Sequence, residues 1–480
     1  MSNSTLAIAY LTTELTPFAK VGGLADVSTA LVRHLHRRGH RVWVFLPGYR
    51  DLPRDAFDPG QRYVIPFAHR QVEVTVHCTA LLDHQPPVYV VDCPAFYHRS
   101  SLYTQDADEP LRAALLTRSA ITHCIHSGLT PQIVHCNDWP GGLTPLDLKR
   151  QAPFSPTPVS LLAIHNLGYQ GDFTADLLVD LDLGSAVDSL DASDLQRGRI
   201  NFLKTGLRHA DALVTVSPTY AREICTAEYG MGLEGILQAR RQDLTGILNG
   251  VDYGEWNPAT DPHLAAPYDA DSLDDKRLNK AALLQRVGLP DDLGPPLVGV
   301  VSRLASQKGF DLMAEVLPTF LARRDFRLVV LGSGEAAFEE LFAQLQATYP
   351  DQVRFHRGFD NALAHLIEGG ADAFLMPSRY EPCGLNQMYS LRYGTIPLVR
   401  RTGGLADTVV PFDAEANRGT GVVFEHYDAT GLAWGLNTVL KLYREPERWR
   451  QLQTNAMAQD FSWDRQGAAY EDLYRRLVDR

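Results

Sequence analysis

The sequence predicts an α/β protein with two domains, each built on a parallel sheet. Three observations support this prediction. Short apolar runs alternate with segments of helical periodicity along the chain, which is the pattern of strand–helix–strand units. A stretch rich in Gly, Pro, Asp and Asn, residues 249–272, separates the two halves. The pentapeptide GGLAD occurs once in each half, at residues 22–26 and at residues 403–407.

The first half opens with a strand–loop–helix–strand unit. Residues 6–11 and 41–47 are apolar runs that fit buried strands. Between them, Val27, Leu31 and Leu35 recur every four positions and so share one helix face. The first GGLAD loop is therefore expected between the carboxyl end of a strand and the start of a helix. Further strands are expected at residues 87–92, 132–136, 159–166 and 211–217.

The second half repeats this scheme. Helices are expected near residues 310–323 and 335–348. Strands are expected at residues 297–301, 327–331, 353–357, 372–376 and 396–400. The tail, residues 457–480, is expected to be helical because its apolar side chains fall on one side. We therefore divide the chain into a first domain (residues 1–250), a second domain (251–456) and a C-terminal helix (457–480).

The composition argues against several classes of protein. The 480 residues carry 45 Lys and Arg against 57 Asp and Glu, a net charge of -12, which disfavours a binder of nucleic acid or of an anionic membrane. The N-terminus lacks the basic and apolar segments of a signal peptide, and no apolar run is long enough to span a bilayer. The six cysteines form no C-x-x-C pair, so we expect reduced thiols in the cytoplasm and no zinc site.

Open parallel sheets bind ligands beyond the carboxyl ends of their strands. Both GGLAD loops are expected at such strand ends, where glycines let backbone N–H groups approach a ligand. We therefore expect the two halves to offer these loops to one shared cleft.

Two polar loops of the second half are candidate binding elements. Arg303 and Lys308 follow the strand at 297–301, and two cations without a carboxylate between them suit a diphosphate; two solvated surface charges fit equally well. Further on, Pro382 favours the first position of a helix with Glu381 as its cap, which would leave the following N–H groups for an anion. Since a carboxylate repels phosphate, Glu381 fits the hydroxyls of an adjoining sugar; a plain helix cap is the alternative.

The motifs VHCNDWP and AIHNLGYQGDF hold the candidates of the first half. His165 and Asn166 come directly after an expected strand, at a position that suits a ligand, although a lone histidine there also fits a structural role. Asp138 fits a functional carboxylate or a helix cap. Trp139 and Tyr169 could stack on sugar rings or fill a core.

A competing motif is VVLGSGEAA at residues 329–337, which fits the dinucleotide fingerprint G-x-G-x-x-A. That fingerprint needs an acidic residue at the end of the next strand to hold a ribose. Here the next expected strand ends in Arg357 and Gly358, which disfavours a nicotinamide enzyme.

Seven stretches, in order, resemble the bacterial glycogen synthases and plant starch synthases, a family of glycosyltransferases. The stretches are KVGGLADV, HCNDW, HNLGYQGDF, GILNGVD, SRLASQKG, PSRYEPCGLNQMYSLRYG and RTGGLADTV. The resemblance spans nearly the whole chain. It implies the glycosyltransferase B fold, with two Rossmann-like domains facing a central cleft and a C-terminal helix packing back on the first domain.

The resemblance also implies roles for individual residues. Arg303 and Lys308 resemble the family's diphosphate clamp, and Glu381 resembles the carboxylate that holds glucose hydroxyls. The residues it implies at the donor are Lys20, Gly22, Gly23, Asn249, Arg303, Lys308, Gly384 and Leu385. Those it implies in catalysis are His165, Glu381, Arg303, Lys308 and Asp138. Our candidates for binding the acceptor are Asp26, Trp139, Asn166 and Tyr169.

The implied reaction moves glucose from ADP-glucose to the non-reducing 4-hydroxyl end of an α-1,4-glucan and retains the α configuration. No cofactor or metal is implied. The sequence departs from many members of the family at Asn137, where they have His, and at Val21 and Asn386, where they have Thr. The last departure puts the affinity for the donor in doubt.

Three other functions compete with this reading. The nearest is a related retaining glycosyltransferase with another donor, such as UDP-glucose, or another acceptor. A catalytically silent glucan-binding protein is the second, and the presence of Arg303, Lys308 and Glu381 argues against it. The nicotinamide oxidoreductase is the third.

Overall fold

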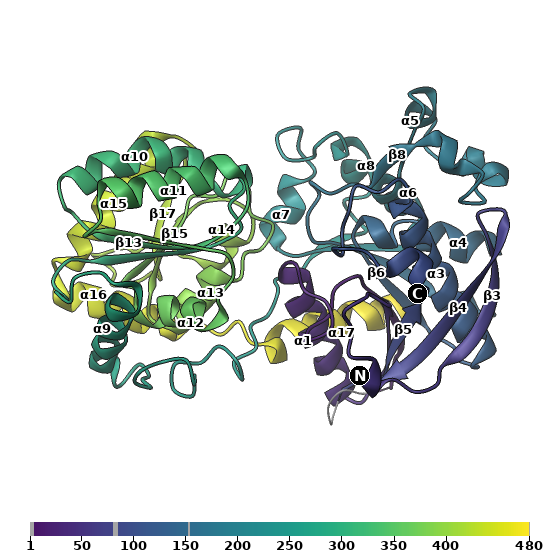
Figure 1. The fold of residues 1–480 in the computed structure, drawn as a ribbon, viewed down its shortest axis with the longest axis horizontal. Coiled ribbons are helices and arrows are strands. Elements are labelled where there is room, and N and C mark those ends of the chain that lie inside the picture. The colour runs from purple at the N-terminus through teal and green to yellow at the C-terminus, as the bar shows by residue number, and fades with distance from the viewer. Residues whose placement is uncertain (1–3, 80–84, 152–153, 480) are drawn as a thin grey trace. The chain divides into compact units, whose positions relative to one another are not determined.

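The computed structural model describes residues 4–79, 85–151 and 154–479. The chain divides into two compact units (Figure 1). The first unit comprises Met1–Val216, Ala221–Gly250 and Trp463–Arg480, and the second comprises Ser217–Tyr220 and Val251–Ser462. Each is an α/β unit around one large sheet.

A nine-stranded sheet forms the centre of the first unit, in the order β11-β10-β7-β6-β1-β2-β5-β4-β3. The strands are β1 (Ala7–Leu11), β2 (Arg41–Pro47), β3 (Gln61–Phe67), β4 (Arg70–Thr79), β5 (Val88–Asp92), β6 (Ile133–Asn137), β7 (Val159–Ile164), β10 (Ala212–Thr215) and β11 (Leu244–Gly246). The strands from β11 to β5 are parallel, as expected, but β4 runs antiparallel to both β5 and β3. The sequence analysis missed this hairpin, whose strand β3 alternates buried and exposed residues as a one-sided edge strand does.

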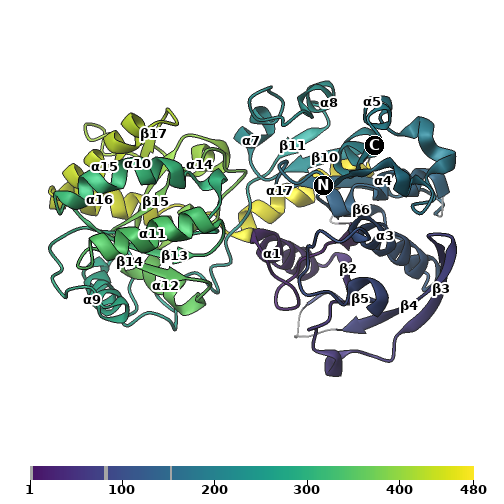
Figure 2. The same cartoon turned by 45° about the horizontal axis from the view of Figure 1, so that its top comes forward.

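The first unit's core lies under two helices that are far apart in the sequence. The helices of this unit are α1 (Gly23–Arg37), α2 (Pro94–Tyr97), α3 (Glu109–His126), α4 (Thr144–Gln151), α5 (Ala192–Gln196), α6 (Phe202–His209), α8 (Glu234–Ala239) and α17 (Trp463–Val478), while α7 (Pro218–Glu223) starts in the second unit. Figure 2 shows α17 beside α1. There Tyr474 bonds to His135 over 2.7 Å, and the buried carboxylate of Glu471 lies 3.1 Å from His34 and 3.0 Å from Arg38.

The C-terminal helix is shorter than expected. Helix α16 (Pro446–Met457) ends where the expected helix over 457–480 was to begin, and α17 starts only at Trp463. Between them the backbone is extended, because the Phe461 carbonyl accepts the Val251 N–H and Ser462 pairs with Val251 as an isolated bridge.

The second unit has a six-stranded sheet in the order β14-β13-β12-β15-β16-β17, and all its strands are parallel. They are β12 (Leu297–Val301), β13 (Arg327–Gly332), β14 (Val353–Arg357), β15 (Ala373–Met376), β16 (Ile396–Arg400) and β17 (Val422–Phe424). The helices are α9 (Lys276–Val287), α10 (Phe310–Ala322), α11 (Ala336–Thr348), α12 (Asn361–Gly370), α13 (Asn386–Arg392), α14 (Gly403–Thr408), α15 (Ala429–Tyr443) and α16. In Figure 1 they cover both faces of this sheet, with α10 and α11 on one side and α9 and α12 on the other.

The strand order places the polar loops of each unit next to each other. Along the chain, the second sheet grows from β12 outwards through β13 and β14, then returns to the other side of β12 with β15. The first sheet does the same, with β2 on one side of β1 and β6 on the other. Ligands of open parallel sheets bind at such reversal points. The loops after β12 and β15, and those after β1 and β6, are therefore the candidate sites.

Candidate active site

An ion pair joins the two reversal-point loops of the second unit. Lys308, in the loop after β12, places its Nζ 2.6 Å from Oε2 of Glu381, in the loop after β15. The Ser378 hydroxyl donates to the same oxygen over 3.0 Å. Only 6% of the Glu381 side chain is exposed, against 20% for Lys308. A charge this buried needs a partner, and Lys308 supplies it.

Backbone contacts hold these two loops together. The Arg379 N–H donates to the Gln307 carbonyl over 2.8 Å, and the Gln307 side chain donates to the Tyr380 carbonyl over 3.1 Å. Gly309 has a φ of +79°, and a Cβ there would lie 2.1 Å from the Pro377 carbonyl oxygen. The loops therefore approach each other more closely than any other residue at 309 would permit.

Arg303 lies in the same loop, five residues before Lys308, with an exposed side chain. Its neighbours fix the backbone: Leu304 donates to the Ser333 carbonyl over 2.9 Å. A Cβ on Gly332 would lie 2.0 Å from the Ser302 carbonyl, and one on Gly334 would lie 2.3 Å from the Leu304 carbonyl. Close packing against the Arg303 loop thus accounts for the two glycines of the apparent dinucleotide fingerprint.

The helix expected to start at Pro382 starts four residues later, so Glu381 is not its cap. Helix α13 begins at Asn386, and Gly384 has a left-handed φ of +74° that no helix continues through. The carbonyls before it serve other partners. Pro382 accepts from the Ser217 hydroxyl over 2.6 Å, and Cys383 accepts from the Gln387 amide over 3.0 Å. This excludes Glu381 as a helix cap, so the remaining hypothesis is that its carboxylate binds sugar hydroxyls.

The second GGLAD supports the loop that carries Glu381. The Gly404 N–H donates to the carbonyls of Glu381 and Pro382 at 3.1 and 3.2 Å. A Cβ on Gly403, whose φ is +43°, would lie 1.8 Å from the Glu381 carbonyl oxygen. One on Gly404 would lie 2.2 Å from the Cys383 carbonyl oxygen. These glycines let two backbones touch, and this close packing accounts for glycine at both positions without a ligand.

The first GGLAD is arranged differently. The N–H groups of Val21 and Gly22 donate to Oε2 of Glu14, at 2.8 and 2.9 Å. Gly22 has an extended φ of −147°, and a Cβ there would meet nothing within 4 Å. Lys20 pairs with Asp26 over 2.7 Å, and both side chains are partly exposed. The Gly22 N–H expected to face a ligand is therefore already bonded, and Lys20 is held by a carboxylate in the first turn of α1.

Glu14 was not among the expected site residues. It is 4% exposed, directly after β1, and its second oxygen accepts from the Tyr103 hydroxyl over 2.9 Å. Beside it, the described part of the first unit has a hollow with aromatic walls, lined by Thr13, Tyr49, Tyr97, Tyr103, Arg112 and Trp139 among others. The signal that could have identified Glu14 is its place, three residues beyond an apolar strand and within the loop of a repeated motif.

The candidates of the first unit meet at the carboxyl ends of β6 and β7. The Asp138 carboxylate accepts from the backbone N–H of His165 over 2.7 Å and, at 3.4 Å, from that of Asn166. The His165 Nε2 lies 2.8 Å from Oδ1 of Asn137, which also accepts from the Tyr10 hydroxyl at 3.3 Å. Asp138 stands at the N-cap position of the short 3-10 helix Trp139–Gly141, but its side chain makes no capping hydrogen bond. The carboxylate aligns the backbone at His165 instead, while Asn137 orients the imidazole.

Burial shifts the protonation of both groups. It raises the pKa of Asp138 to about 7, and it lowers the pKa of His165 to about 4. The imidazole is therefore neutral at pH 7, where it can donate or accept a hydrogen bond without adding positive charge.

The acceptor-side aromatic residues differ in exposure. Trp139 packs edge-to-face on Phe173, with ring centroids 5.4 Å apart, and a Cβ on Gly171 would lie 2.6 Å from its ring. Tyr169 is 53% exposed. Asn166 uses its side-chain oxygen to accept from the Gly168 N–H over 2.9 Å. Tyr169 is therefore the more exposed of the two rings, whereas Trp139 is half-buried in an aromatic cluster.

Two further residues bear on ligand binding. Asn249, just after β11, is 6% exposed, and its Oδ1 has no hydrogen-bond partner in the part of the chain that the structure describes. Phe359, which the sequence analysis did not single out, follows β14 and is 77% exposed. It adjoins Gly358, whose N–H donates to the Gly332 carbonyl over 3.0 Å, so it lies on the same sheet edge as the Arg303 loop.

Within residues 4–79, 85–151 and 154–479, no three His, Cys, Asp or Glu side chains gather as a metal site would require. In the same ranges no helix has the length and apolar character needed to cross a membrane.

Comparisons with known proteins agree with the resemblance. Residues 7–239 match the family model "Starch synthase catalytic domain", and residues 284–455 match "Glycosyl transferases group 1". The chain is 45% identical to a glycogen synthase of Anaeromyxobacter sp. (strain Fw109-5), over 98% of this chain and 100% of that protein. It is 44% identical to a glycogen synthase of Myxococcus xanthus, over 98% and 99%.

Solved structures show the same fold. The catalytic domain of starch synthase IV from Arabidopsis thaliana, bound to ADP and acarbose, superposes with a TM-score of 0.90 at 34% identity, covering 99% of this chain and 100% of that one. A sucrose-phosphate synthase from Thermosynechococcus elongatus reaches 0.64 at 18% identity, covering 99% of each chain. The second likeness shows the fold alone.

The repeated motif gives an asymmetric stability prediction. Gly403→Ala places a Cβ against the Glu381 carbonyl at a left-handed φ, so it should lower the free energy of unfolding by about 2–4 kcal/mol. Gly22→Ala, in open space, should cost less than about 1 kcal/mol. Urea denaturation of both variants checks this, and equal losses would contradict the contrast.

The raised pKa of Asp138 makes stability depend on pH. Between about pH 4 and pH 7 the folded carboxyl keeps a proton that the unfolded one has lost, so its contribution to stability falls as pH rises. Asp138→Asn keeps a side-chain oxygen that can accept from the His165 N–H and removes the titrating carboxyl group. Its melting temperature, relative to wild type, should therefore rise across that range, with exposed Asp176→Asn as the matched control. A flat difference would mean that Asp138 is ionised throughout.

Proposed function

The chain belongs to the family of glycogen synthases and starch synthases, and we propose that it transfers glucose from ADP-glucose to the non-reducing 4-hydroxyl of an α-1,4-glucan. The observation that carries the proposal is the ion pair between Lys308 and Glu381 at the reversal point of the second sheet. A cation there suits the diphosphate of the donor, and a carboxylate suits its sugar hydroxyls.

The ion pair would exchange partners when the donor binds. Without a donor, Lys308 neutralises the buried Glu381 carboxylate. With one bound, Lys308 and Arg303 would turn to the diphosphate, and Glu381 would accept hydrogen bonds from glucose hydroxyls. The Lys308 ammonium and the Glu381 carboxylate would each exchange one polar partner for another, so neither charge would be buried without a partner. The backbone of Gly384 and Leu385 would add N–H donors to the phosphate.

Phe359 is the residue of this sheet edge that best suits the nucleotide base. Its ring is 77% exposed, more than any other large apolar side chain in the described part of the chain. A purine offers a wide flat face to such a ring. The preference for ADP-glucose rests on this ring and on the relative of known structure that was solved with ADP.

The chemistry develops charge of both signs. As the bond from the anomeric carbon to phosphate stretches, negative charge grows on the diphosphate, where Lys308 and Arg303 would stabilise it without a metal. Positive charge grows on the sugar ring. The imidazole of His165 is neutral at pH 7, so it would not repel the positive charge on the sugar ring. The acceptor hydroxyl would attack from the face that the diphosphate leaves, and the departing phosphate would take its proton.

The acceptor glucan would lie on the first unit. Tyr169 offers an exposed ring. Asp26 lies in the first turn of α1, and Trp139 and Asn166 follow β6 and β7 at the same edge of the first sheet. Asn249, which we assign to the donor, has a buried oxygen that can accept from a hydroxyl of ADP-glucose. We also propose that the protein works in the cytoplasm, where its six cysteine thiols would remain reduced.

Transfer of labelled glucose to glycogen tests the proposal. Wild type should transfer from ADP-glucose at a higher kcat/KM than from UDP-glucose, and the new linkages should be α-1,4. Lys308→Ala should lower kcat about 10²-fold or more, as the loss of one charge-stabilising donor does. Lys441→Ala, an exposed lysine on α15, is the matched control.

Two results would contradict the proposal. Preferred transfer from UDP-glucose would refute the choice of donor. A Lys308→Ala enzyme within twofold of wild type would refute the role of Lys308.

A further inference from the structure

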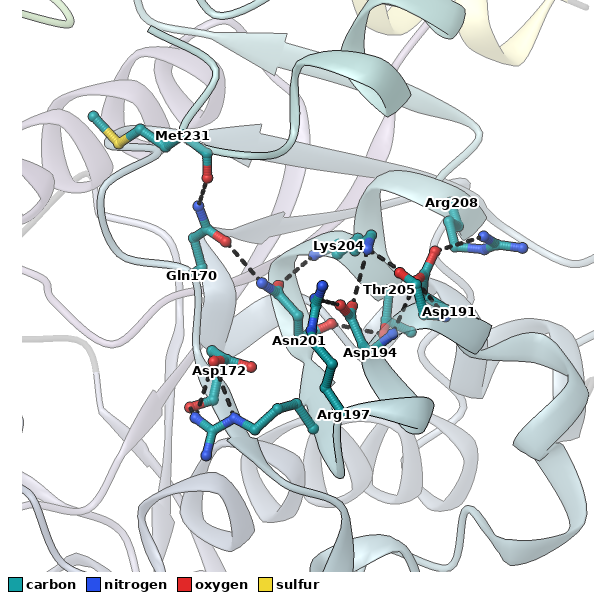
Figure 3. Close-up of polar contacts among 12 residues, drawn as sticks. Gln170, Asp172, Asp191, Asp194, Arg197, Asn201, Lys204, Thr205, Arg208 and Met231 are labelled. Atoms are coloured by element: carbon teal, nitrogen blue, oxygen red, sulfur yellow. Dashed lines mark hydrogen bonds and ion pairs between the residues drawn. The ribbon is translucent and has the colours of Figure 1, made fainter. Parts of the chain in front are cut away.

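The loop that carries His165 is held at its far end by Gln170, a residue to which the proposed function gives no part. Its Nε2 donates to the Met231 carbonyl over 3.0 Å, and its Oε1 accepts from the Asn201 amide over 2.7 Å (Figure 3). One side chain thus bridges two segments that lie 31 and 61 residues further along the chain.

The direction of the Gln170 amide follows from its neighbour. Asn201 is the N-cap of α6, and its Oδ1 accepts from the Lys204 N–H over 2.8 Å. Only its NH₂ group is left for Gln170, so Gln170 must present its oxygen there. The Gln170 NH₂ group then faces the Met231 carbonyl. Each amide fixes the orientation of the next.

The start of α6 is itself anchored by charge. The Lys204 ammonium lies 2.9 Å from Asp191 and 3.1 Å from Asp194, and Figure 3 shows it between the two carboxylates. Arg208 pairs with Asp191 over 3.2 Å. The α6 N-terminus is therefore a fixed support for the bridge through Gln170.

The other end of the bridge is a strained turn. Met231 has a left-handed φ of +50°, which is uncommon for a residue other than glycine, and its side chain is 37% exposed. Such a conformation persists only where neighbours hold it. The next N–H, of Gly232, donates to Glu234 over 3.0 Å, and Gln170 holds the Met231 carbonyl.

We propose that Gln170 is a positioning residue for the acceptor glucan. By tying the Met231 turn to the His165 loop, it would fix the positions of two exposed side chains, Tyr169 and Met231, that can meet the sugar rings behind the terminal glucose. Aromatic and thioether groups suit the apolar faces of sugars. A surface fixed in advance costs less entropy when a flexible glucan binds. This inference rests on the proposed function.

Two variants break the bridge from opposite ends. Gln170→Glu still accepts from Asn201 but turns a carboxylate oxygen towards the Met231 carbonyl. Asn201→Asp still caps α6 but loses its NH₂ group, so Gln170 would turn its own NH₂ group to the new carboxylate and its oxygen to Met231. Both changes place two acceptors face to face at Met231. Arg62→Ala, which removes an exposed ion pair between β3 and β4 of the same unit and leaves the supports of Gln170 intact, is the matched control.

The experiment measures KM for a series of maltooligosaccharides at saturating ADP-glucose, with thermal melting as a check of folding. In both variants, KM for long acceptors should rise about fivefold, the equivalent of one net hydrogen bond. KM for the shortest acceptor, KM for the donor and kcat should stay within twofold of wild type. Retardation in a native gel containing glycogen should fall in parallel, and the control should match wild type.

Unchanged KM for long acceptors, or an equal loss for every acceptor length, would overturn the inference. If wild type transfers no glucose at all, the proposed function fails instead. The glycogen gel still tests Gln170 in that case: undiminished retardation of both variants would refute its role.

Discussion

The donor side of this molecule depends on one buried charge, the carboxylate of Glu381. It sits at the point where the second sheet reverses its order, and Lys308 from the neighbouring loop neutralises it. Keeping that carboxylate in place requires two backbones to come very close, which explains glycine at 309 and at 403. Sequence motifs more than seventy residues apart thus serve one electrostatic requirement.

The first unit meets a similar requirement with hydrogen bonds instead of an ion pair. The Asp138 carboxylate accepts a hydrogen bond from the backbone N–H of His165, and the Glu14 carboxylate accepts from the backbone N–H groups at the start of the first GGLAD motif. These acids shape loops and leave the neutral imidazole as the polar group that can meet a ligand. Gln170 continues this arrangement at the far end of the same loop. The second unit therefore offers a buried ion pair at its sheet edge, whereas the first unit uses buried carboxylates to fix the conformation of its loops.

The sequence predicted the alternation of strands and helices well, because buried parallel strands are short continuous apolar runs. Residues 41–47 and 297–301 were predicted to the residue. The antiparallel hairpin of β3 and β4 was missed because both strands alternate buried and exposed positions, whereas the parallel strands were recognised as continuous buried apolar runs. The start of α13 was placed too early because Pro382 gave a local helix signal, which the packing of Gly403 and Gly404 against that stretch overrides. Glu14 and Gln170 were missed because their partners are distant in sequence or are backbone atoms.

The most direct test is a crystal structure of the protein with ADP bound. Without a ligand, Lys308 Nζ lies 2.6 Å from Glu381. With ADP bound, we expect it to leave Glu381 and to come within about 3 Å of a diphosphate oxygen. Glu381 would then face the position of the glucose. An unbroken pair between Lys308 and Glu381, with the diphosphate bound elsewhere, would contradict this expectation.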